Sequence, residues 1–213
     1  TIPVGKNGMS AGAIKFDGTV TVPEGSAYHV VDSTPKVLSA NRNLIINGDM
    51  QVAQRGTSAT IPGGSGYHTV DRFMMNVDPT QFDNMSTMEQ NLDSLTPPED
   101  LSNYVGIKIN TGTVPTKNPY FNFRQNIEGS NSQLLKFGTA NAKTVTISFW
   151  VRSTVTGDFS FNLRNGASDR TYVTTYNIAS ANTWEKKTIT ITGDTTGTWE
   201  IDNTVGMTVN WGL

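Results

Sequence analysis

Cysteine is absent from the chain, which excludes a disulfide framework, a thiolate zinc site, an iron–sulfur site and a cysteine nucleophile. Charged residues are scarce, at 16% of 213 residues with a formal net charge of −2, so a nucleic-acid-binding surface has no bulk electrostatic support. No apolar run approaches the roughly 18 residues of a membrane span. We therefore expect neither nucleic acid nor a membrane as a partner.

Signals for catalysis and for metal binding are also sparse. The two histidines, His29 and His68, have no metal-ligand partner at helical or strand spacing, and no G-x-S-x-G elbow, P-loop or Rossmann fingerprint occurs. The acidic cluster at residues 89–100 lies in a proline-rich stretch typical of a solvated surface. We therefore expect no enzymatic activity, no catalytic residue and no cofactor.

Calcium is the one ion that deserves separate consideration, because loop oxygens of β-sandwich domains often hold it. Asp49, Asp71, Asp78 and Asp83 lie in predicted loops or at strand ends, but no D-x-D-x-D-G spacing occurs. The sequence therefore predicts no metal site, with a structural calcium ion as the weaker alternative.

What the chain has in abundance is Thr, Asn and Gly, with 30, 20 and 20 residues, about a third of the chain. All three disfavour helices. Apolar and polar residues alternate instead, most clearly at residues 143–152, where Val145, Ile147, Phe149 and Val151 share one face. Similar alternation occurs at residues 104–110, 158–164, 188–192 and 205–211. The pattern predicts antiparallel strands with one wet face, packed as an all-β sandwich.

Turn-rich links separate these predicted strands, at residues 62–66, 165–169 and 192–197, where Gly, Asn and Asp tolerate the positive φ of tight turns. Only residues 85–95 hint at a helix, with Met85, Met88 and Leu92 at spacings of three and four. We expect at most one or two short helices.

The first 42 residues differ in texture from the rest. Short apolar runs at residues 13–16, 20–22 and 28–31 alternate with glycines, and each run is too short to bury a core. We interpret them as an arm of short strands that packs on another surface; edge strands of the main domain are the alternative. Residues 43–213 then form the sandwich. The chain stops directly after a predicted strand, which fits either a buried last strand or a truncated domain.

The richest motif occupies residues 43–57, N-L-I-I-N-G-D-M-Q-V-A-Q-R-G-T, followed by Y-H-T-V-D-R-F at residues 67–73. An arginine fork can pair with the two oxygens of a carboxylate, and Asp49 or Asp71 is the expected partner of Arg55 and Arg72. We predict that six polar residues clamp loops onto a sheet edge: Asn47, Asp49, Gln54, Arg55, Asp71 and Arg72.

These two motifs, the T-V-T-I-S-F-W-V-R strand at residues 144–152 and the T-W-E at residues 183–185 resemble the distal domains of bacteriophage tail fibres and related virion appendages. Those domains are similar in turn to jelly-roll carbohydrate-binding modules. The resemblance runs from about Asn43 to Leu213. It implies a jelly-roll fold and a virion structural protein, trimeric, whose N-terminal arm docks on other virion proteins, with a host-surface glycan as a further expected partner.

A glycan site needs an aromatic platform with hydrogen-bonding groups beside it. Trp150 is out of phase with the apolar face of its strand, so it is predicted to point away from the core, together with Ser148 and Arg152. These three residues form the predicted glycan site. Alternatively, Trp150 is covered by the arm, a loop or a neighbouring subunit. Trp184, Trp199 and Trp211 are predicted to lie in the core.

Three functions remain open from the sequence. The first is a non-enzymatic virion appendage that assembles on the particle and presents a surface to the host. The second is a free carbohydrate-binding module that targets a polysaccharide, and the third is a polysaccharide hydrolase.

Overall fold

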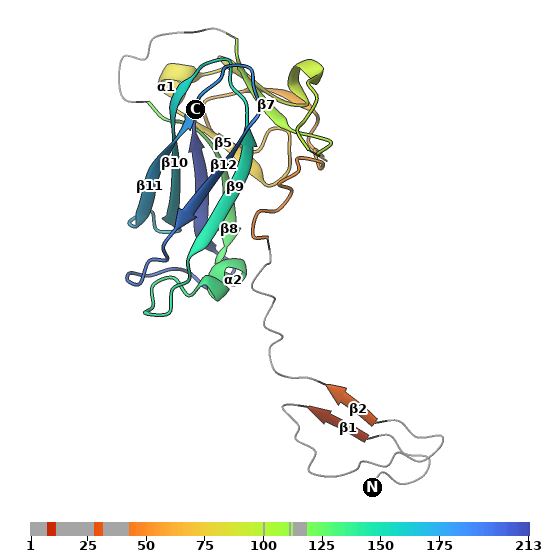
Figure 1. Ribbon diagram of the computed structural model, residues 1–213, viewed down its shortest axis with the longest axis vertical. Coiled ribbons are helices and arrows are strands. Elements are labelled where there is room, and N and C mark those ends of the chain that lie inside the picture. The colour runs from red at the N-terminus through yellow and green to blue at the C-terminus, as the bar shows by residue number, and fades with distance from the viewer. Residues whose placement is uncertain (1–7, 12–27, 32–42, 100, 111, 113–118) are drawn as a thin grey trace. The chain divides into compact units, whose positions relative to one another are not determined.

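The computed structural model describes residues 8–11, 28–31, 43–99, 101–110, 112 and 119–213. The chain divides into two compact units, Thr1–Asn43 and Leu44–Leu213. In the first unit, strands β1 (Gly8–Ala11) and β2 (Tyr28–Val31) pair in parallel (Figure 1). The apolar runs at residues 13–16 and 20–22 lie outside the described residues.

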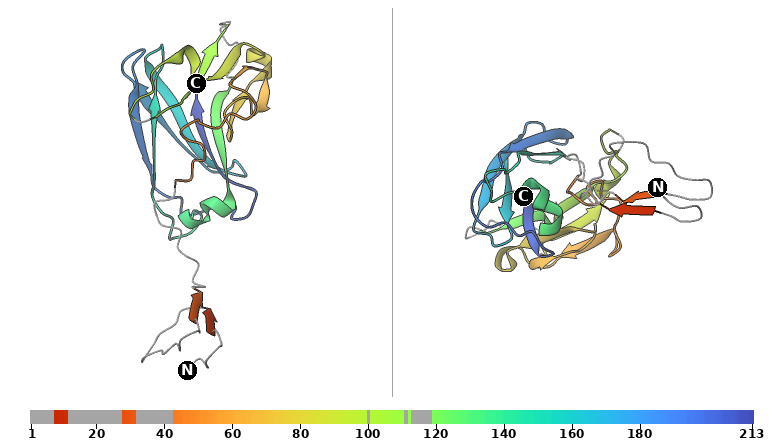
Figure 2. Two further views of the ribbon diagram at one scale, coloured as in Figure 1. Left: turned by 90° about the vertical axis from the view of Figure 1, so that its right-hand side faces the viewer. Right: turned by 90° about the horizontal axis from the view of Figure 1, so that it is seen from below.

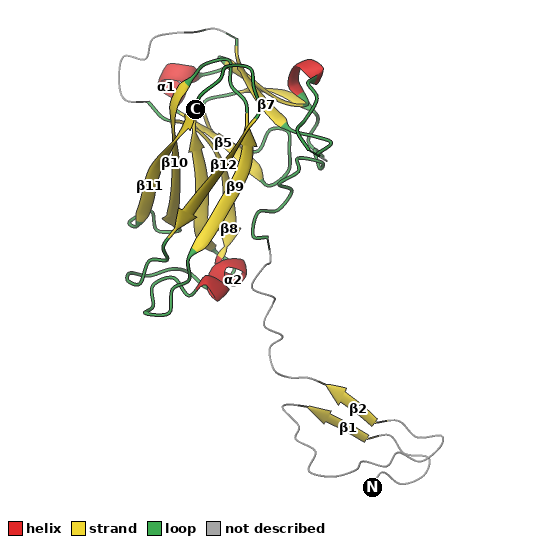
Figure 3. Cartoon of the chain, viewed as in Figure 1, coloured by secondary structure: helices red, strands yellow, loops and turns green. Residues whose placement is uncertain are grey.

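The second unit consists mainly of strands, drawn in yellow in Figure 3. They are β3 (Ser58–Ile61), β4 (Gly64–Gly66), β5 (Phe73–Val77), β6 (Ser86–Gln90), β7 (Val105–Ile109), β8 (Phe121–Glu128), β9 (Val145–Val151), β10 (Gly157–Asn165), β11 (Thr171–Ile178), β12 (Glu185–Ile191) and β13 (Val205–Gly212). Six of them form one sheet in the order β11-β10-β13-β8-β5-β4. The smaller sheets are β12-β9 and β3-β6-β7, and the described pairings of this unit are antiparallel.

The smaller sheets pack against one face of the six-stranded sheet, which makes a sandwich (Figures 1 and 2). Phe149 of β9 reaches across to Tyr176 and Trp211, with ring centroids 5.1 and 5.7 Å apart. Met88 of β6 is fully buried in a cluster with Phe73 of β5. The predicted all-β antiparallel sandwich is therefore confirmed, while its assignment as a jelly roll stays a prediction.

Two hydrophobic clusters fill the sandwich, and Trp211 of β13 packs against both. The larger cluster lies under the β12-β9 sheet and contains Ile127, Phe137, Phe161, Leu163, Tyr176, Ile178, Ile189, Ile191, Met207 and Val209. The second lies under the β3-β6-β7 sheet and contains Ile61, Val70, Phe73, Met75, Val77, Met88, Phe121 and Phe123. Trp199 packs on the larger cluster. Trp184, predicted to be in the core, lies in neither cluster; its ring packs edge-on against Tyr104 instead.

The alternation predicted for residues 143–152 is present in β9. Val145, Ile147, Phe149 and Val151 pack on the larger cluster, whereas the intervening Thr146 and Ser148 are exposed. This is the period of two that places successive side chains on opposite faces of a sheet.

The helical spacing noted at residues 85–95 does not form a helix. Residues 86–90 form β6, in which Met88 points into the core, and only a 3₁₀ turn (Leu92–Ser94) follows. Strand pairing with both β3 and β7 overrides the weak helical spacing of the methionines. The α-helices of the described residues, α1 (Pro79–Phe82) and α2 (Gly129–Ser132), have four residues each, and no helix among those residues has the length and apolar character to cross a bilayer.

The turn between β10 and β11 shows how a polar residue fixes a hairpin. Asn165 is 1% exposed, and its side-chain oxygen accepts hydrogen bonds from the backbone N–H groups of Asp169 and Arg170, both at 3.2 Å. Its amide nitrogen donates to the Thr198 carbonyl at 3.0 Å. A side chain at Gly166 would collide with the carbonyl of Val205, so this turn requires glycine.

Candidate functional site

The predicted loop clamp Asn47 lies at a tight turn with φ of +58°. Its side chain donates to the carbonyls of Val52 and Asp71, at 2.9 and 3.0 Å, and accepts from the Val52 N–H at 2.9 Å. These bonds join the two halves of the motif, residues 43–57 and 67–73.

Two predicted arginines form ion pairs, one of them with an unexpected partner. Arg55 pairs with Asp71 at 2.7 Å, and its guanidinium lies 5.4 Å from the ring centroid of Tyr67. Arg72 pairs with Glu128 of β8 at 2.7 Å, and this corrects the expected pairing with Asp49 or Asp71. The extended β8 brings Glu128, 56 residues later in sequence, beside the start of β5.

Asp49 and Gln54 are exposed, and neither side chain makes a hydrogen bond or ion pair with another described residue. Their role as clamps stays a prediction. The glutamine that does hold the motif is Gln125 of β8, which sequence reasoning missed. It is fully buried, accepts from the Ile46 N–H at 2.9 Å and donates to the Ile46 carbonyl at 2.9 Å. An inward-facing Gln within the apolar alternation of residues 121–128 was the available signal.

The predicted glycan residues lie on the outer face of the β12-β9 sheet. Ser148 is exposed opposite Thr188, and Trp150 is half-buried opposite Lys186, whose amine lies 5.6 Å from the indole centroid. Lys186 also contacts Glu99 at 3.4 Å.

The Arg152 guanidinium turns to the next loop, where it donates to the Asn182 carbonyl at 2.9 Å and to the Asn182 side chain at 3.3 Å. The structure therefore brings Trp150 and Ser148 together on one face, but the donors of Arg152 are directed to Asn182. Glycan binding by these three residues stays a prediction.

A second polar surface covers the outside of the six-stranded sheet. Alternation in the interior strands β8, β10 and β13 points ten side chains away from the core, and we call them the outer sheet face: Asn122, Arg124, Asn126, Glu128, Asp158, Ser160, Asn162, Arg164, Thr208 and Asn210. In register, Arg124, Asn210 and Asn162 form one row across the strands. Asn126, Thr208 and Arg164 form the next row.

Hydrogen bonds within these rows fix the side chains. Asn210 donates to the side-chain oxygen of Asn162 at 2.8 Å, and Thr208 donates to that of Asn126 at 3.0 Å. Thr208 and Asn210 are only 3% and 4% exposed, since they lie on the central strand of the sheet. The half-buried amides of Asn126 and Asn162 retain further donor or acceptor capacity for a ligand.

Two exposed tyrosines flank this face. Tyr120 precedes β8 in phase with Asn122 and Arg124, and Tyr67 follows β4 in phase with Ser65, whose hydroxyl is 3.5 Å from Arg124. Tyr67 is 41% exposed and Tyr120 is 44% exposed, and both lie close enough to Arg124 to affect the pKa of its guanidinium. The sequence alone gave no way to rank these rings above the other tyrosines; the strand register does so.

The arginines of the outer sheet face lack counterions. Among the described residues, no carboxylate forms an ion pair with Arg124 or Arg164, and the Nε atoms of both are buried without a hydrogen-bond partner. Burial, and then the nearby Arg164, lower the pKa of the Arg124 guanidinium. Because arginine remains protonated at neutral pH, this face is a fixed positive charge.

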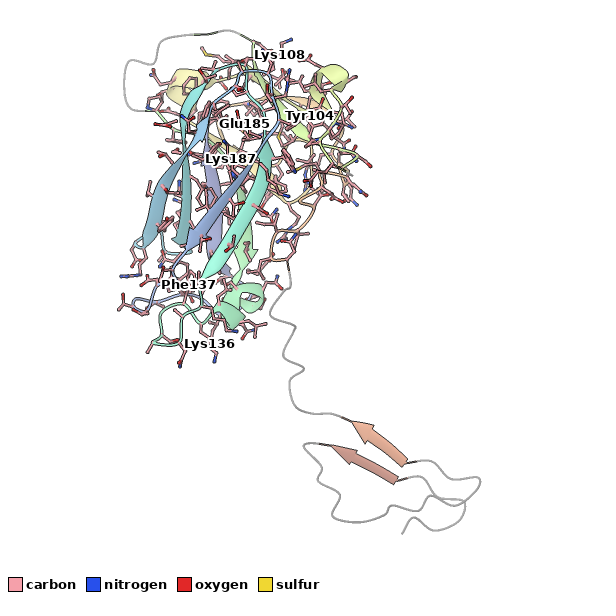
Figure 4. The ribbon with its side chains drawn as sticks, in the orientation of Figure 1. Tyr104, Lys108, Lys136, Phe137, Glu185 and Lys187 are labelled. Carbon is pink, nitrogen blue, oxygen red and sulfur yellow. The ribbon has the colours of Figure 1, made fainter. Side chains whose placement is uncertain are left out.

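The polar cluster of Glu185 and Lys187 is internally satisfied. Glu185 and Lys187 lie on the inward side of β12 (Figure 4), paired at 2.6 Å, and Glu185 also accepts the N–H groups of Ala179 and Ser180. The hydrogen bond from Lys187 lowers the pKa of Glu185.

A pocket of about 380 Å³ lies near Phe137, at the α2 end of the sandwich (Figure 4), with Tyr172 and Trp199 in its wall. Arg170 also lines this pocket, but its guanidinium already donates hydrogen bonds to Asp194 and Thr196.

Of the four aspartates that the sequence suggests as calcium ligands, three make local hydrogen bonds or ion pairs and Asp49 is exposed. Asp71 pairs with Arg55, Asp78 accepts from the Thr80 N–H at the start of α1, and Asp83 accepts from the Gly63 N–H. In the described part of the chain, no three His, Asp or Glu side chains gather as a metal site would require.

Comparisons with known proteins identify no family. No protein-family model matches the chain, and no curated protein is similar to it at a significant level. Among solved structures, the enzymatically active domain of tailspike protein 4 from bacteriophage CBA120 is similar with a TM-score of 0.46 and 14% identity. The match covers 88% of this chain and 24% of the tailspike chain, so the chain spans about a quarter of that protein's length.

This comparison corrects one expectation from the sequence. The chain was predicted not to be an enzyme, and the similar tailspike domain is an enzymatically active one, which contradicts a non-enzymatic assignment. The low identity and TM-score assign no reaction to this chain.

Proposed function

We propose that this chain is a module of a phage tail appendage that binds a host-surface glycan through the outer sheet face. The observation that carries the proposal is the position of two exposed tyrosines, Tyr67 and Tyr120, beside Arg124 and a hydrogen-bonded row of asparagines. Tyrosine rings stack on the apolar faces of sugars, and amides and guanidinium groups hydrogen-bond sugar hydroxyls.

The supporting scaffold is rigid. The asparagines stand on the middle strands of a six-stranded sheet whose other face is packed against two hydrophobic clusters. Sites built on strands hold their side chains more closely in place than sites built on loops. The tail assignment rests on the resemblance of residues 43–57, 67–73 and 144–152 to appendage domains.

The remaining parts of the proposal concern assembly. Residues 1–42 would dock on other virion proteins, and the appendage would be a homotrimer located on the virion. A free monomeric carbohydrate-binding module is the alternative. Light scattering separates the two, because a stable monomer with glycan affinity supports the free module, whereas a trimer supports the appendage.

The test of glycan binding uses a bacterial polysaccharide array followed by calorimetry with the bound polysaccharide. Tyr67→Ala and Tyr120→Ala should each weaken binding about fivefold, since a stacked ring contributes on the order of 1 kcal/mol. Tyr172→Ala is the matched control, because Tyr172 is 39% exposed but lies at the pocket near Phe137.

Two outcomes contradict the proposal. If Trp150→Ala abolishes binding while both tyrosine variants keep it, the site lies on the β12-β9 sheet. If no polysaccharide binds, the glycan proposal fails. Release of reducing ends from a bound polysaccharide would instead assign a hydrolase.

A further inference from the structure

The arginines of the outer sheet face point to the class of glycan, an inference that rests on the proposed function and narrows it. Arg124 lies on β8 and Arg164 on β10, at opposite ends of two adjacent rows that cross β13. Arg72 joins the same face through its pair with Glu128. Of the two carboxylates on this face, Glu128 pairs with Arg72 and Asp158 accepts from the Asn177 amide, so neither pairs with Arg124 or Arg164.

No other described residue neutralises the guanidinium groups of Arg124 and Arg164. Arg124 makes one long contact, 3.5 Å to the Ser65 hydroxyl, and Arg164 makes no side-chain hydrogen bond with a described residue. Both side chains are half-buried, so water solvates them only partly. Placing two half-buried like charges near one another costs free energy, and a structure tolerates this where a ligand supplies the opposite charge.

The shape of the guanidinium groups indicates which ligand group would pair with them. A guanidinium presents paired donors that match the two oxygens of a carboxylate, and such charge-assisted bonds are shorter and stronger than bonds to neutral hydroxyls. A neutral sugar would desolvate both arginines without supplying charge. The tyrosines beside Arg124 supply the apolar contact for a sugar ring that carries the carboxylate.

We propose that the outer sheet face binds an acidic polysaccharide whose sugar carboxylates pair with Arg124 and Arg164. The net charge of −2 for the whole chain does not oppose this, because local charge governs contact at a few ångströms in salt solution.

The experiment compares one polysaccharide in two forms: the acidic polysaccharide found on the array, and the same polymer with its carboxylates reduced to alcohols. Binding of the intact full-length chain should weaken at least about tenfold on reduction and should fall as NaCl is raised. The double variant Arg124→Gln and Arg164→Gln should bind the acidic form at least about tenfold more weakly. Lys108→Gln, which removes an exposed positive charge from β7 of the β3-β6-β7 sheet, should bind like the unmodified chain.

A second measurement separates binding from folding. Because the double variant removes mutual repulsion, its melting temperature should equal or exceed that of the unmodified chain. Equal binding of the acidic and reduced forms, array binding confined to neutral polymers, or full affinity of the double variant overturns the acidic assignment and leaves glycan binding intact. Binding of no polymer overturns both.

Discussion

The guanidinium of Arg170 donates two hydrogen bonds to the carboxylate of Asp194, from Nε to Oδ2 and from Nη2 to Oδ1, the latter at 2.9 Å. The pair joins the start of β11 to the loop after β12, which belong to opposite sheets of the sandwich. Asp194 also accepts from the Thr196 N–H at 3.0 Å. The hydrogen bond from Arg170 holds the pKa of Asp194 far below its ordinary value.

This pair predicts acid sensitivity. Because the folded-state pKa of Asp194 is depressed, its contribution to stability is complete above the unfolded-state value of about 3.9 and is lost as the pH falls below it. Asp194→Asn should lower the melting temperature by a few degrees at pH 7 and should flatten its dependence on pH between about 4 and 2. Thermal melts across that range measure this, and an unchanged slope would contradict the role given to the pair.

We expect the hydrogen bonds of the buried Gln125 to stabilise the fold without any ion pair. Gln125→Leu places an apolar side chain of similar size in the core but leaves the N–H and carbonyl of Ile46 without partners, which should cost about 1–3 kcal/mol of unfolding free energy. Gln54→Leu is the control, because Gln54 is exposed. Urea denaturation should show a large loss only for Gln125→Leu. A larger loss for Gln54→Leu would restore Gln54 as the clamp predicted from the sequence.

The two tryptophans of β9 and β13 should behave oppositely. Trp211 lies within 6.5 Å of the ring centroids of Phe73, Phe123, Phe149 and Phe161, so Trp211→Ala should destabilise the sandwich by about 3–5 kcal/mol. Trp150 contacts Lys186 on an outer face, and Trp150→Ala should leave the melting temperature nearly unchanged. A large loss of stability or of assembly for Trp150→Ala would identify a subunit interface instead.

Truncation tests the division of the chain. Both hydrophobic clusters are made of residues within Leu44–Leu213, so a chain of residues 43–213 should fold without the first 42 residues. Circular dichroism and a cooperative melt check this. Aggregation of the shortened chain would show that the first residues complete the sandwich.

The fold was accessible from sequence because period-two alternation reports directly on strands with one buried face. Residues 145–151 and 207–211 show this, since their apolar positions are the ones that pack inward. The helical spacing at residues 85–95 forms no helix for the converse reason: methionine spacing is a local signal, whereas pairing of β6 with β3 and β7 is set by distant residues.

The site was less accessible, because it depends on register across strands far apart in sequence. Arg124, Asn162 and Asn210 come together only when β8, β13 and β10 pair as they do. No spacing within one segment reveals such a row. Trp150 stood out in sequence because a single strand carries its whole signal.

The account is tested most directly by mapping the bound glycan on the isotope-labelled chain by NMR. Addition of the acidic polysaccharide fragment should shift the resonances of Tyr67, Tyr120 and the strands around Arg124 and Arg164. Shifts confined to β9 and β12 around Trp150, or to the pocket beside Tyr172, would contradict it.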